Sequence, residues 1–290
     1  MKALIFGING QDGYYLSKIC QRNGVEVIGV SRSHGNWLIG SVSDFTLVES
    51  LTKLHKPEYI FHLAANSTTK HSAVFENNET IVTGTLNILE SVKNHSPKTK
   101  VFLSGSAMQF KNSGEPIDEQ TEWDVSSPYA VSRIQSIYFA MYYRKLGLEI
   151  YAGYLFNHDS PQRHECHITQ KIAKAVNRIS NGSNEILEIG NIEVKKEFTF
   201  AGDVANAIWL LVNNKSKIYE CVIGSGKAYS IKEWIEICCK KYKINSEKIV
   251  IVNKNFNPEY AILVSNPKLI FSLGWEPKIK IEQLAEMMLN

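Results

Sequence analysis

The chain has 290 residues, 44% of them hydrophobic and 21% charged, as in an ordinary soluble globular protein of one large or two small domains. Its formal net charge of +3 is too small to indicate nucleic-acid binding, and its five cysteines lack both metal-ligand spacing and the even number of a disulfide framework. The chain opens on a strand rather than a signal peptide and has no apolar run near about 18 residues, so we expect a cytoplasmic protein without membrane segment or metal.

Short apolar runs alternate with amphipathic helical patterns through the first half of the chain. Strands are expected at residues 3–6, 25–30, 59–63, 101–103 and 150–155, and helices at 15–23, 45–53, 80–93 and 127–146. This alternation predicts a doubly wound parallel sheet, with ligands bound along the edge where the strands end. Beyond residue 156 the pattern becomes less regular, with a helix expected near 169–180 and shorter mixed elements after it.

A glycine-rich turn lies between the first strand and the first helix. Gly7, Gly10 and Gly13 have the spacing G-x-x-G-x-x-G, which permits a tight turn and lets a pyrophosphate approach the N–H groups of a helix N-terminus. The same turn contains Asn9, Gln11 and Asp12. Its place between strand and helix predicts a dinucleotide-binding loop, the alternative being a simple glycine-rich turn.

The second strand ends in Ser31-Arg32-Ser33. An NAD site usually has an acidic residue here for the ribose 2′-hydroxyl, whereas arginine accommodates the 2′-phosphate of NADP. Arg32 therefore favours NADP(H), with NAD(H) as the alternative, over the reading of an ordinary surface arginine.

These observations predict an α/β protein with a Rossmann-type doubly wound parallel sheet and a smaller, interleaved α/β cap. Residues 1–156 would form the dinucleotide-binding domain, with residues 198–226 returning to it. Residues 157–197 and 227–290 would mainly bind the substrate.

The segment 127–133 carries a candidate acid/base pair. Pro128 suits the first turn of a helix, so Tyr129 and Arg133, four residues apart, fall on one helical face. A phenol titrates near about 10, and a fixed positive charge beside it favours the phenolate. The pair could thus move a proton on or off a sugar or alcohol oxygen. The alternative is an exposed Tyr and Arg on a surface helix.

Nearly the whole chain resembles the nucleotide-sugar branch of the extended short-chain dehydrogenase/reductase family. Besides the glycine loop, the resemblance rests on His62-Leu63-Ala64-Ala65-Asn66-Ser67, Gly84-Thr85-Leu86-Asn87-Ile88-Leu89-Glu90, Pro116-Ile117-Asp118-Glu119, Ser127-Pro128-Tyr129-Ala130 and Leu273-Gly274-Trp275-Glu276-Pro277. One run is more specific: Leu155-Phe156-Asn157-His158-Asp159-Ser160-Pro161-Gln162-Arg163, followed by Thr169-Gln170-Lys171-Ile172, is similar to GDP-mannose 4,6-dehydratases. Gly190-Asn191 and Lys196-Glu197-Phe198 stand where that subfamily has Gly-Asn and Arg-Asp-Trp.

The resemblance implies a set of binding residues. The implied cofactor-binding residues are Gly7, Asn9, Gly10, Gln11, Asp12, Gly13, Arg32, Leu63, Ala64, Ala65, Ser67, Tyr129, Arg133, His158 and Arg163. The implied substrate-binding residues are Asn157, Lys171, Lys196 and Glu259.

One departure from the family concerns the chemistry itself. The dehydratases carry a Thr-x-Glu unit where this chain has Ser106-Ala107-Met108. Ser106 keeps a hydroxyl that can orient a C4 oxygen, but Met108 cannot transfer a proton, which would forfeit a contribution of roughly 10²–10⁴-fold to eliminating water. Glu115, Asp118 or Glu119 could substitute only if a loop refolded.

Three further positions depart from the family pattern. Arg133 replaces the usual Lys, keeping the charge but changing the geometry. Asn257 replaces an Arg that contacts phosphate, and Ser41 replaces the acidic residue that meets the adenine.

The catalytic residues expected from this comparison are Ser106, Tyr129 and Arg133. They favour an NADPH-dependent reductase of a GDP-linked 4-keto(-6-deoxy) sugar. The alternatives are a 4,6-dehydratase with a relocated acid, a 4-epimerase, or a non-catalytic nucleotide-binding homologue. The expected partner is a nucleotide-diphospho-sugar, with no nucleic acid and no membrane.

Relatives usually dimerise through the Tyr-bearing helix, so we also expect a homodimer or higher oligomer. The contact would use an apolar stripe that could equally be core, formed by Ile134, Ile137, Tyr138, Met141 and Tyr142.

Overall fold

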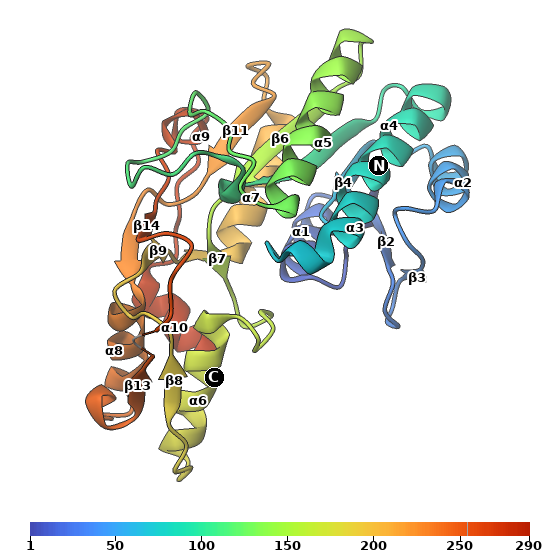
Figure 1. Ribbon diagram of the computed structural model, residues 1–290. Coiled ribbons are helices and arrows are strands. Elements are labelled where there is room, and N and C mark those ends of the chain that lie inside the picture. Colours follow the sequence, from blue (N-terminus) through green and yellow to red (C-terminus); the bar gives the residue numbers. More distant parts are fainter. Residues whose placement is uncertain (254) are drawn as a thin grey trace.

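The computed structural model describes residues 1–253 and 255–290. Its larger part is a seven-stranded sheet in which every neighbouring pair of strands is parallel (Figure 1). The order across the sheet is β11 (Glu220–Ile223), β6 (Ile150–Leu155), β5 (Lys100–Ser106), β4 (Tyr59–His62), β1 (Lys2–Phe6), β2 (Glu26–Ser31) and β3 (Leu38–Ile39). The α/β prediction is confirmed, and all five predicted strands occur. β5 runs on to Ser106 because its last residues pair with the end of β6.

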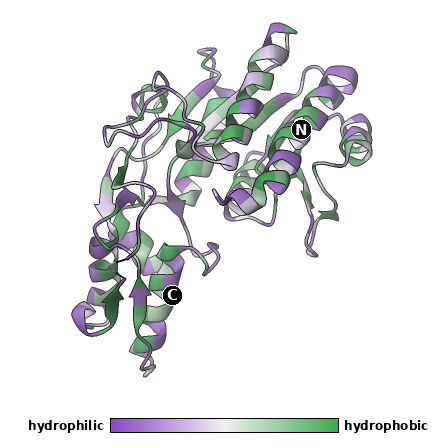
Figure 2. Ribbon diagram, viewed as in Figure 1, coloured by the Kyte–Doolittle hydropathy of each residue, from purple (hydrophilic) through white to green (hydrophobic). Residues whose placement is uncertain are grey.

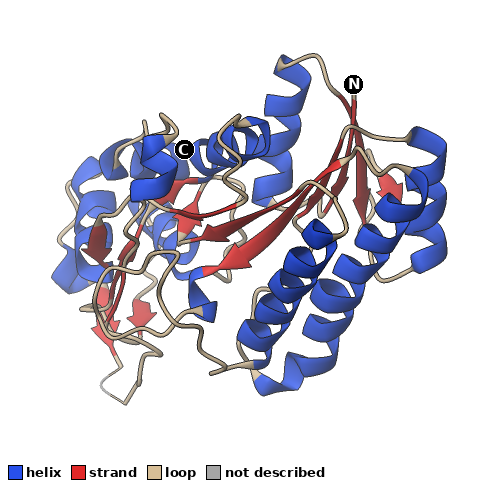
Figure 3. Ribbon diagram, turned by 90° about the horizontal axis from the view of Figure 1, so that it is seen from above, coloured by secondary structure: helices blue, strands red, loops and turns tan. Residues whose placement is uncertain are grey.

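Helices cover both faces of this sheet (Figure 3). On one face Ala3 and Ile5 of β1 pack with α1 (Gln11–Arg22) and α7 (Ala201–Asn213). Leu4 and Phe6 point to the other face, which is covered by α2 (Phe45–His55), α4 (Gly84–His95) and α5 (Pro128–Lys145). Because both faces are buried at the centre of the sheet, β1 and β4 are almost entirely hydrophobic rather than alternating, as the green central strands in Figure 2 show.

A second hydrophobic core lies in the cap at the lower left of Figure 1. Around the buried Trp234 it packs α6 (Ile168–Ser180), α8 (Ile231–Lys241) and α10 (Ile281–Leu289). The cap strands are β8 (Leu187–Ile189), β9 (Lys195–Glu197), β12 (Ala228–Ser230), β13 (Val250–Val252) and β14 (Ile262–Leu263). A two-stranded pair joins the cap to the sheet, β7 (His158–Asp159) with β10 (Thr199–Phe200). Between these cap segments the chain returns to the large sheet as α7 and β11.

The remaining elements are short. They are the 3₁₀ turns η1 (His71–Ala73), η3 (Ala107–Gln109) and η4 (Ser246–Lys248), the helices α3 (Val74–Asn77) and α9 (Lys268–Ser272), and the π-helical η2 (Asn78–Thr83). Within the described residues, no helix has the length and apolar character needed to span a membrane.

Two helices differ from the sequence-based expectation. α1 begins at Gln11 rather than near residue 15, because Gly13 lies inside its first turn instead of in the loop. The helix expected at 80–93 runs continuously out of η2, so its regular part starts at Gly84. The apolar stripe on α5 also divides: Ile134 and Ile137 are buried, whereas Tyr138, Met141 and Tyr142 are 60%, 44% and 56% exposed.

Candidate active site

The strand order reverses between β1 and β4: β2 and β3 lie on one side of β1, and β4, β5 and β6 on the other. The loops that follow β1 and β4 therefore lie side by side at the strand ends. Gly7 follows β1 with φ +90°, and a Cβ on it would lie 2.7 Å from the backbone nitrogen of Ala64, just after β4. Only a residue without a side chain therefore fits at position 7. Ligands of open α/β sheets bind at such a switch point.

A cavity of about 290 Å³ opens above these loops, and we call it the loop cavity. It is lined by seven of the predicted cofactor-binding residues and their neighbours: Gly7, Asn9, Gly10, Arg32, Leu63, Ala64 and Ala65, with Ser31, Ser33, Ser41 and Val42. The close approach of main chain at Gly7 and the glycine at the start of α1 fit the phosphate and adenosine portion of a dinucleotide.

Gln11 and Gly13 support the loop and do not line the loop cavity. Gln11 is buried; its Nε2 donates to the His158 carbonyl at 3.1 Å and its Oε1 accepts from the Ser160 hydroxyl at 2.9 Å. A Cβ on Gly13 would lie 2.5 Å from the Gly7 carbonyl oxygen. The two residues thus fix the loop against the segment after β6 and against itself.

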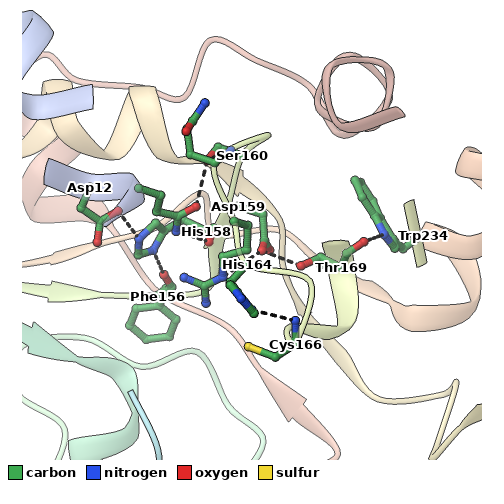
Figure 4. Close-up of polar contacts among 12 residues, drawn as sticks. Asp12, Phe156, His158, Asp159, Ser160, His164, Cys166, Thr169 and Trp234 are labelled. Carbon is green, nitrogen blue, oxygen red and sulfur yellow. Dashed lines mark hydrogen bonds and ion pairs between the residues drawn. The ribbon is translucent and has the colours of Figure 1, made fainter. Parts of the chain in front are cut away.

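Asp12 and His158 form a pair that joins the glycine loop to the cap (Figure 4). His158 Nε2 lies 2.8 Å from Asp12 Oδ1, and Nδ1 lies 2.7 Å from the Phe156 carbonyl. Because both partners of the ring are acceptors, the imidazolium form satisfies both contacts. Burial opposes charge on both groups, but their mutual attraction leaves the pKa of Asp12 lowered and the pKa of His158 raised.

A second cavity, of about 430 Å³, lies at the ends of β5 and β6, and we call it the central cavity. It contains all three predicted catalytic residues, Ser106, Tyr129 and Arg133, together with Met108. Its walls also include Asp12, Leu63, Ser67, Thr69, Asn157, His158, Arg163, Glu259 and Tyr260. The polar side chains at the end of β5 and on α5, which are predicted to carry the chemistry, therefore line the same cavity.

Ser106 is held by the turn that follows β5. Its Oγ accepts from the Met108 N–H at 3.2 Å, and its own N–H donates to Gln109 Oε1 at 2.9 Å, a reciprocal capping arrangement. Since the oxygen already accepts a hydrogen bond, the hydroxyl hydrogen remains available to donate into the cavity. Met108 belongs to the same turn and brings an apolar thioether to the cavity wall.

Arg133 lies beneath Tyr129 on α5 and is anchored to β5. It is only 4% exposed, and Nη1 donates to the Ser104 hydroxyl at 2.9 Å and to the Ser104 carbonyl. Its Cζ lies 5.1 Å from the centre of the Tyr129 ring. The positive charge is therefore fixed against the face of the phenol ring rather than free to swing.

A third cavity, of about 590 Å³, lies in the cap, and we call it the cap cavity. Lys171, Lys196 and Glu259, three of the residues predicted to bind substrate, line it together with Asn191 and Phe256. Lys171 Nζ donates to the Glu188 carbonyl at 3.0 Å, whereas Lys196 is buried, which lowers the pKa of its ammonium. A cation held in so dry a place is positioned to meet an anion.

Positive charge continues between the central and cap cavities. Arg163 lines the central cavity, with its Nε 3.5 Å from Asp159 Oδ1, and Asp159 also accepts from the Thr169 hydroxyl at 2.5 Å. The positive charge also acts on His167. Burial and then the charge of Arg163 lower the pKa of His167 to about 4. The strip formed by Arg163 and Lys196 therefore suits a diphosphate lying between the two cavities.

Several site residues were not predicted. Thr69 donates to Glu259 and so joins a loop of the sheet domain to the cap. The buried Glu197 accepts from the Ser265 N–H at 2.7 Å and the Gly226 N–H at 3.2 Å, tying three cap loops together. Phe256 covers Gly190, where a Cβ would lie 2.5 Å from its ring. Only Glu197 had a sequence signal, because it stands where the family motif has an aspartate.

Comparison with known proteins agrees with this geometry. The family model described as GDP-mannose 4,6 dehydratase matches residues 33–288. GDP-mannose 4,6 dehydratase 1 of Arabidopsis thaliana is 31% identical, covering 99% of this chain and 88% of its own.

Two solved structures share the fold. The dTDP-glucose 4,6-dehydratase of Bacillus anthracis, in complex with NAD, superposes with a TM-score of 0.87 at 18% identity, over 100% of this chain and 95% of its own. RMD from Pseudomonas aeruginosa, complexed with NADPH, superposes with a TM-score of 0.84 at 20% identity, over 99% of this chain and 96% of its own. The chain therefore belongs to the GDP-mannose 4,6-dehydratase family of extended short-chain dehydrogenase/reductase enzymes.

Proposed function

We propose that this chain is an NADPH-dependent reductase of a GDP-linked 4-keto-6-deoxy sugar. The observation that carries the proposal is the central cavity, which combines a hydroxyl donor and a phenol with the thioether of Met108. Reduction of a ketone needs a hydride, a proton and a group that orients the oxygen. Elimination of water needs a further acid/base group, which Met108 cannot be.

The chain's own residues would handle the oxygen. The Ser106 hydroxyl donates to the C4 carbonyl oxygen, and Tyr129 transfers its phenolic proton to that oxygen as the carbonyl becomes an alcohol. The Arg133 guanidinium, fixed against the ring, stabilises the phenolate that remains. When bound, a nicotinamide cofactor supplies the hydride.

The binding residues divide among the three cavities. Arg32 in the loop cavity favours NADP(H). RMD is complexed with NADPH and the dehydratase of Bacillus anthracis with NAD, which supports a nicotinamide dinucleotide here. Asn157, Lys171 and Lys196 would meet the diphosphate of the sugar nucleotide, and Arg163 the cofactor. The names of the relatives support GDP as the nucleotide.

The test is consumption of NADPH, followed at 340 nm, with GDP-4-keto-6-deoxymannose as substrate. We expect turnover by the natural chain and a fall of roughly 10²–10⁴-fold in Tyr129→Phe, which keeps the ring but loses the proton. Cofactor and GDP binding should survive in that variant. A natural chain that binds both ligands without oxidising NADPH contradicts the reductase proposal and leaves either a dehydratase without net cofactor turnover or a non-catalytic binding role.

A second candidate is a 4,6-dehydratase in which Glu259 takes over the acid/base work. Its carboxylate lines the same cavity as Met108 and Tyr129 and is held by Thr69, and the relatives carry the dehydratase name. This candidate predicts a 4-keto-6-deoxy product from GDP-mannose without net cofactor turnover. Glu259→Gln should abolish that product, whereas the reductase proposal predicts that oxidation of NADPH with GDP-4-keto-6-deoxymannose continues in the same variant.

A further inference from the structure

Glu76 of α3 lies beside the residue expected to select the cofactor. Its Oε1 is 3.0 Å from Arg32 Nη2, and its Oε2 accepts from Asn66 Nδ2 at 2.7 Å. Both carboxylate oxygens are therefore engaged. The acid reaches Arg32 from a helix after β4, not from the end of β2, where acidic residues of NAD sites usually stand.

The contact occurs at the rim of the loop cavity, where a ribose 2′-group is expected. Ser31 Oγ lies 3.2 Å from Ser33 Oγ, which also accepts from Asn9 Nδ2 at 3.1 Å, and all three line the cavity with Arg32. Arg32 is thus the cation of a polar cluster, and its charge is already neutralised by Glu76.

The ion pair is open to solvent, with side-chain exposures of 61% for Arg32 and 41% for Glu76. Such a pair contributes little to stability, so the guanidinium can turn toward a ligand. A 2′-phosphate must share Arg32 with the carboxylate and also meets its negative charge, whereas a 2′-hydroxyl is neutral and meets neither penalty. Hydrogen bonds from Arg32 and Asn66 lower the pKa of Glu76, so the carboxylate is ionised at neutral pH.

We propose that Glu76 sets the cofactor preference of this chain by competing with the 2′-phosphate for Arg32, which holds the preference for NADPH over NADH to a modest value. The proposal rests on cofactor binding in the loop cavity, as in the proposed function. It assigns specificity to a residue outside the strand–loop–helix unit that normally carries it.

The test compares dissociation constants for NADPH and NADH, measured by cofactor fluorescence, in the natural chain and in Glu76→Gln. The amide can still bond to Asn66 but carries no charge. We expect NADPH affinity to rise about 3- to 10-fold, as for removal of one like charge near a phosphate, while NADH affinity stays within about twofold. Glu122→Gln is the matched control, since it breaks the exposed Lys111–Glu122 pair elsewhere, and neither constant should change.

Arg32→Ala and the double variant complete the cycle. If Glu76 acts through Arg32, the gain from Glu76→Gln should shrink in the Arg32→Ala background. Equal changes for both cofactors, or no change for NADPH, would overturn the proposal while leaving the proposed function intact. A folded natural chain that binds neither cofactor would instead overturn the proposed function, and this proposal with it.

Discussion

The loop cavity and the cap cavity depend on different kinds of residue. The loop cavity is shaped by main chain and missing side chains, with Gly7 against Ala64 and Gly13 against the Gly7 carbonyl. The cap cavity depends on a buried charge, Lys196, in a region tied together by Glu197. The first should therefore be sensitive to added volume, and the second to changed charge.

Adding a methyl group at Gly13 should have the largest effect, because it should distort the glycine loop and so disrupt the loop cavity. The Cβ of Gly13→Ala would lie 2.5 Å from the Gly7 carbonyl, so we expect a loss of about 1–3 kcal/mol in unfolding free energy and no measurable cofactor binding. Gly10→Ala is the control, because its Cβ meets only the same carbonyl, at 3.4 Å. Urea unfolding should find Gly10→Ala close to the natural chain in stability. Equal destabilisation of the two variants would contradict the packing argument.

Removing the charge of Lys196 should weaken ligand binding in the cap cavity without unfolding the cap. Methionine keeps much of the volume packed near Phe198, whose ring centre lies 5.4 Å from Nζ. We expect calorimetric titration of Lys196→Met with GDP to give an affinity about 10- to 100-fold lower, from lost charge-assisted hydrogen bonds. The stability should not fall, since a buried charge has been removed. Lys195→Met, at the exposed neighbouring position, should bind GDP normally; a matching loss there would point to a general charge effect.

The Asp12–His158 pair joins the two regions, and its effect should depend on pH. The pKa of His158 is raised, so its contribution is complete below the pKa of an unfolded histidine and is lost as pH rises through the folded value. The pKa of Asp12 is lowered, so its contribution is present above the unfolded value and lost as pH falls through the folded one. The pair should stabilise the fold most between about pH 4 and 6.5. Unfolding of His158→Gln from pH 3 to 9 should lack this maximum, whereas His34→Gln, at an exposed position, should retain it.

Sequence reasoning found the parts of the site that local patterns encode. The glycine loop follows from strand, turn and helix in immediate succession, and the Tyr129–Arg133 pair follows from helical spacing. Contacts between distant segments have no such pattern. Arg32 and Glu76 are 44 positions apart, and Thr69 and Glu259 are 190 apart, so their meeting depends on how α3 and the cap loops dock. Gly13 is predicted in the loop but lies in the first turn of α1, because its place depends on the path of the Gly7 carbonyl, against which it packs.

The interleaving of sheet and cap has a consequence for how the molecule unfolds. The chain leaves the sheet after β6, returns as α7 and β11, and leaves again for β12 and α8. Neither core can open fully without straining connections that belong to the other. Glu197, which precedes that return, accepts hydrogen bonds from Gly226 and Ser265, which follow it. The two cores should therefore melt in a single cooperative transition, and a ligand that binds only the cap should also slow hydrogen exchange in the strands of the sheet.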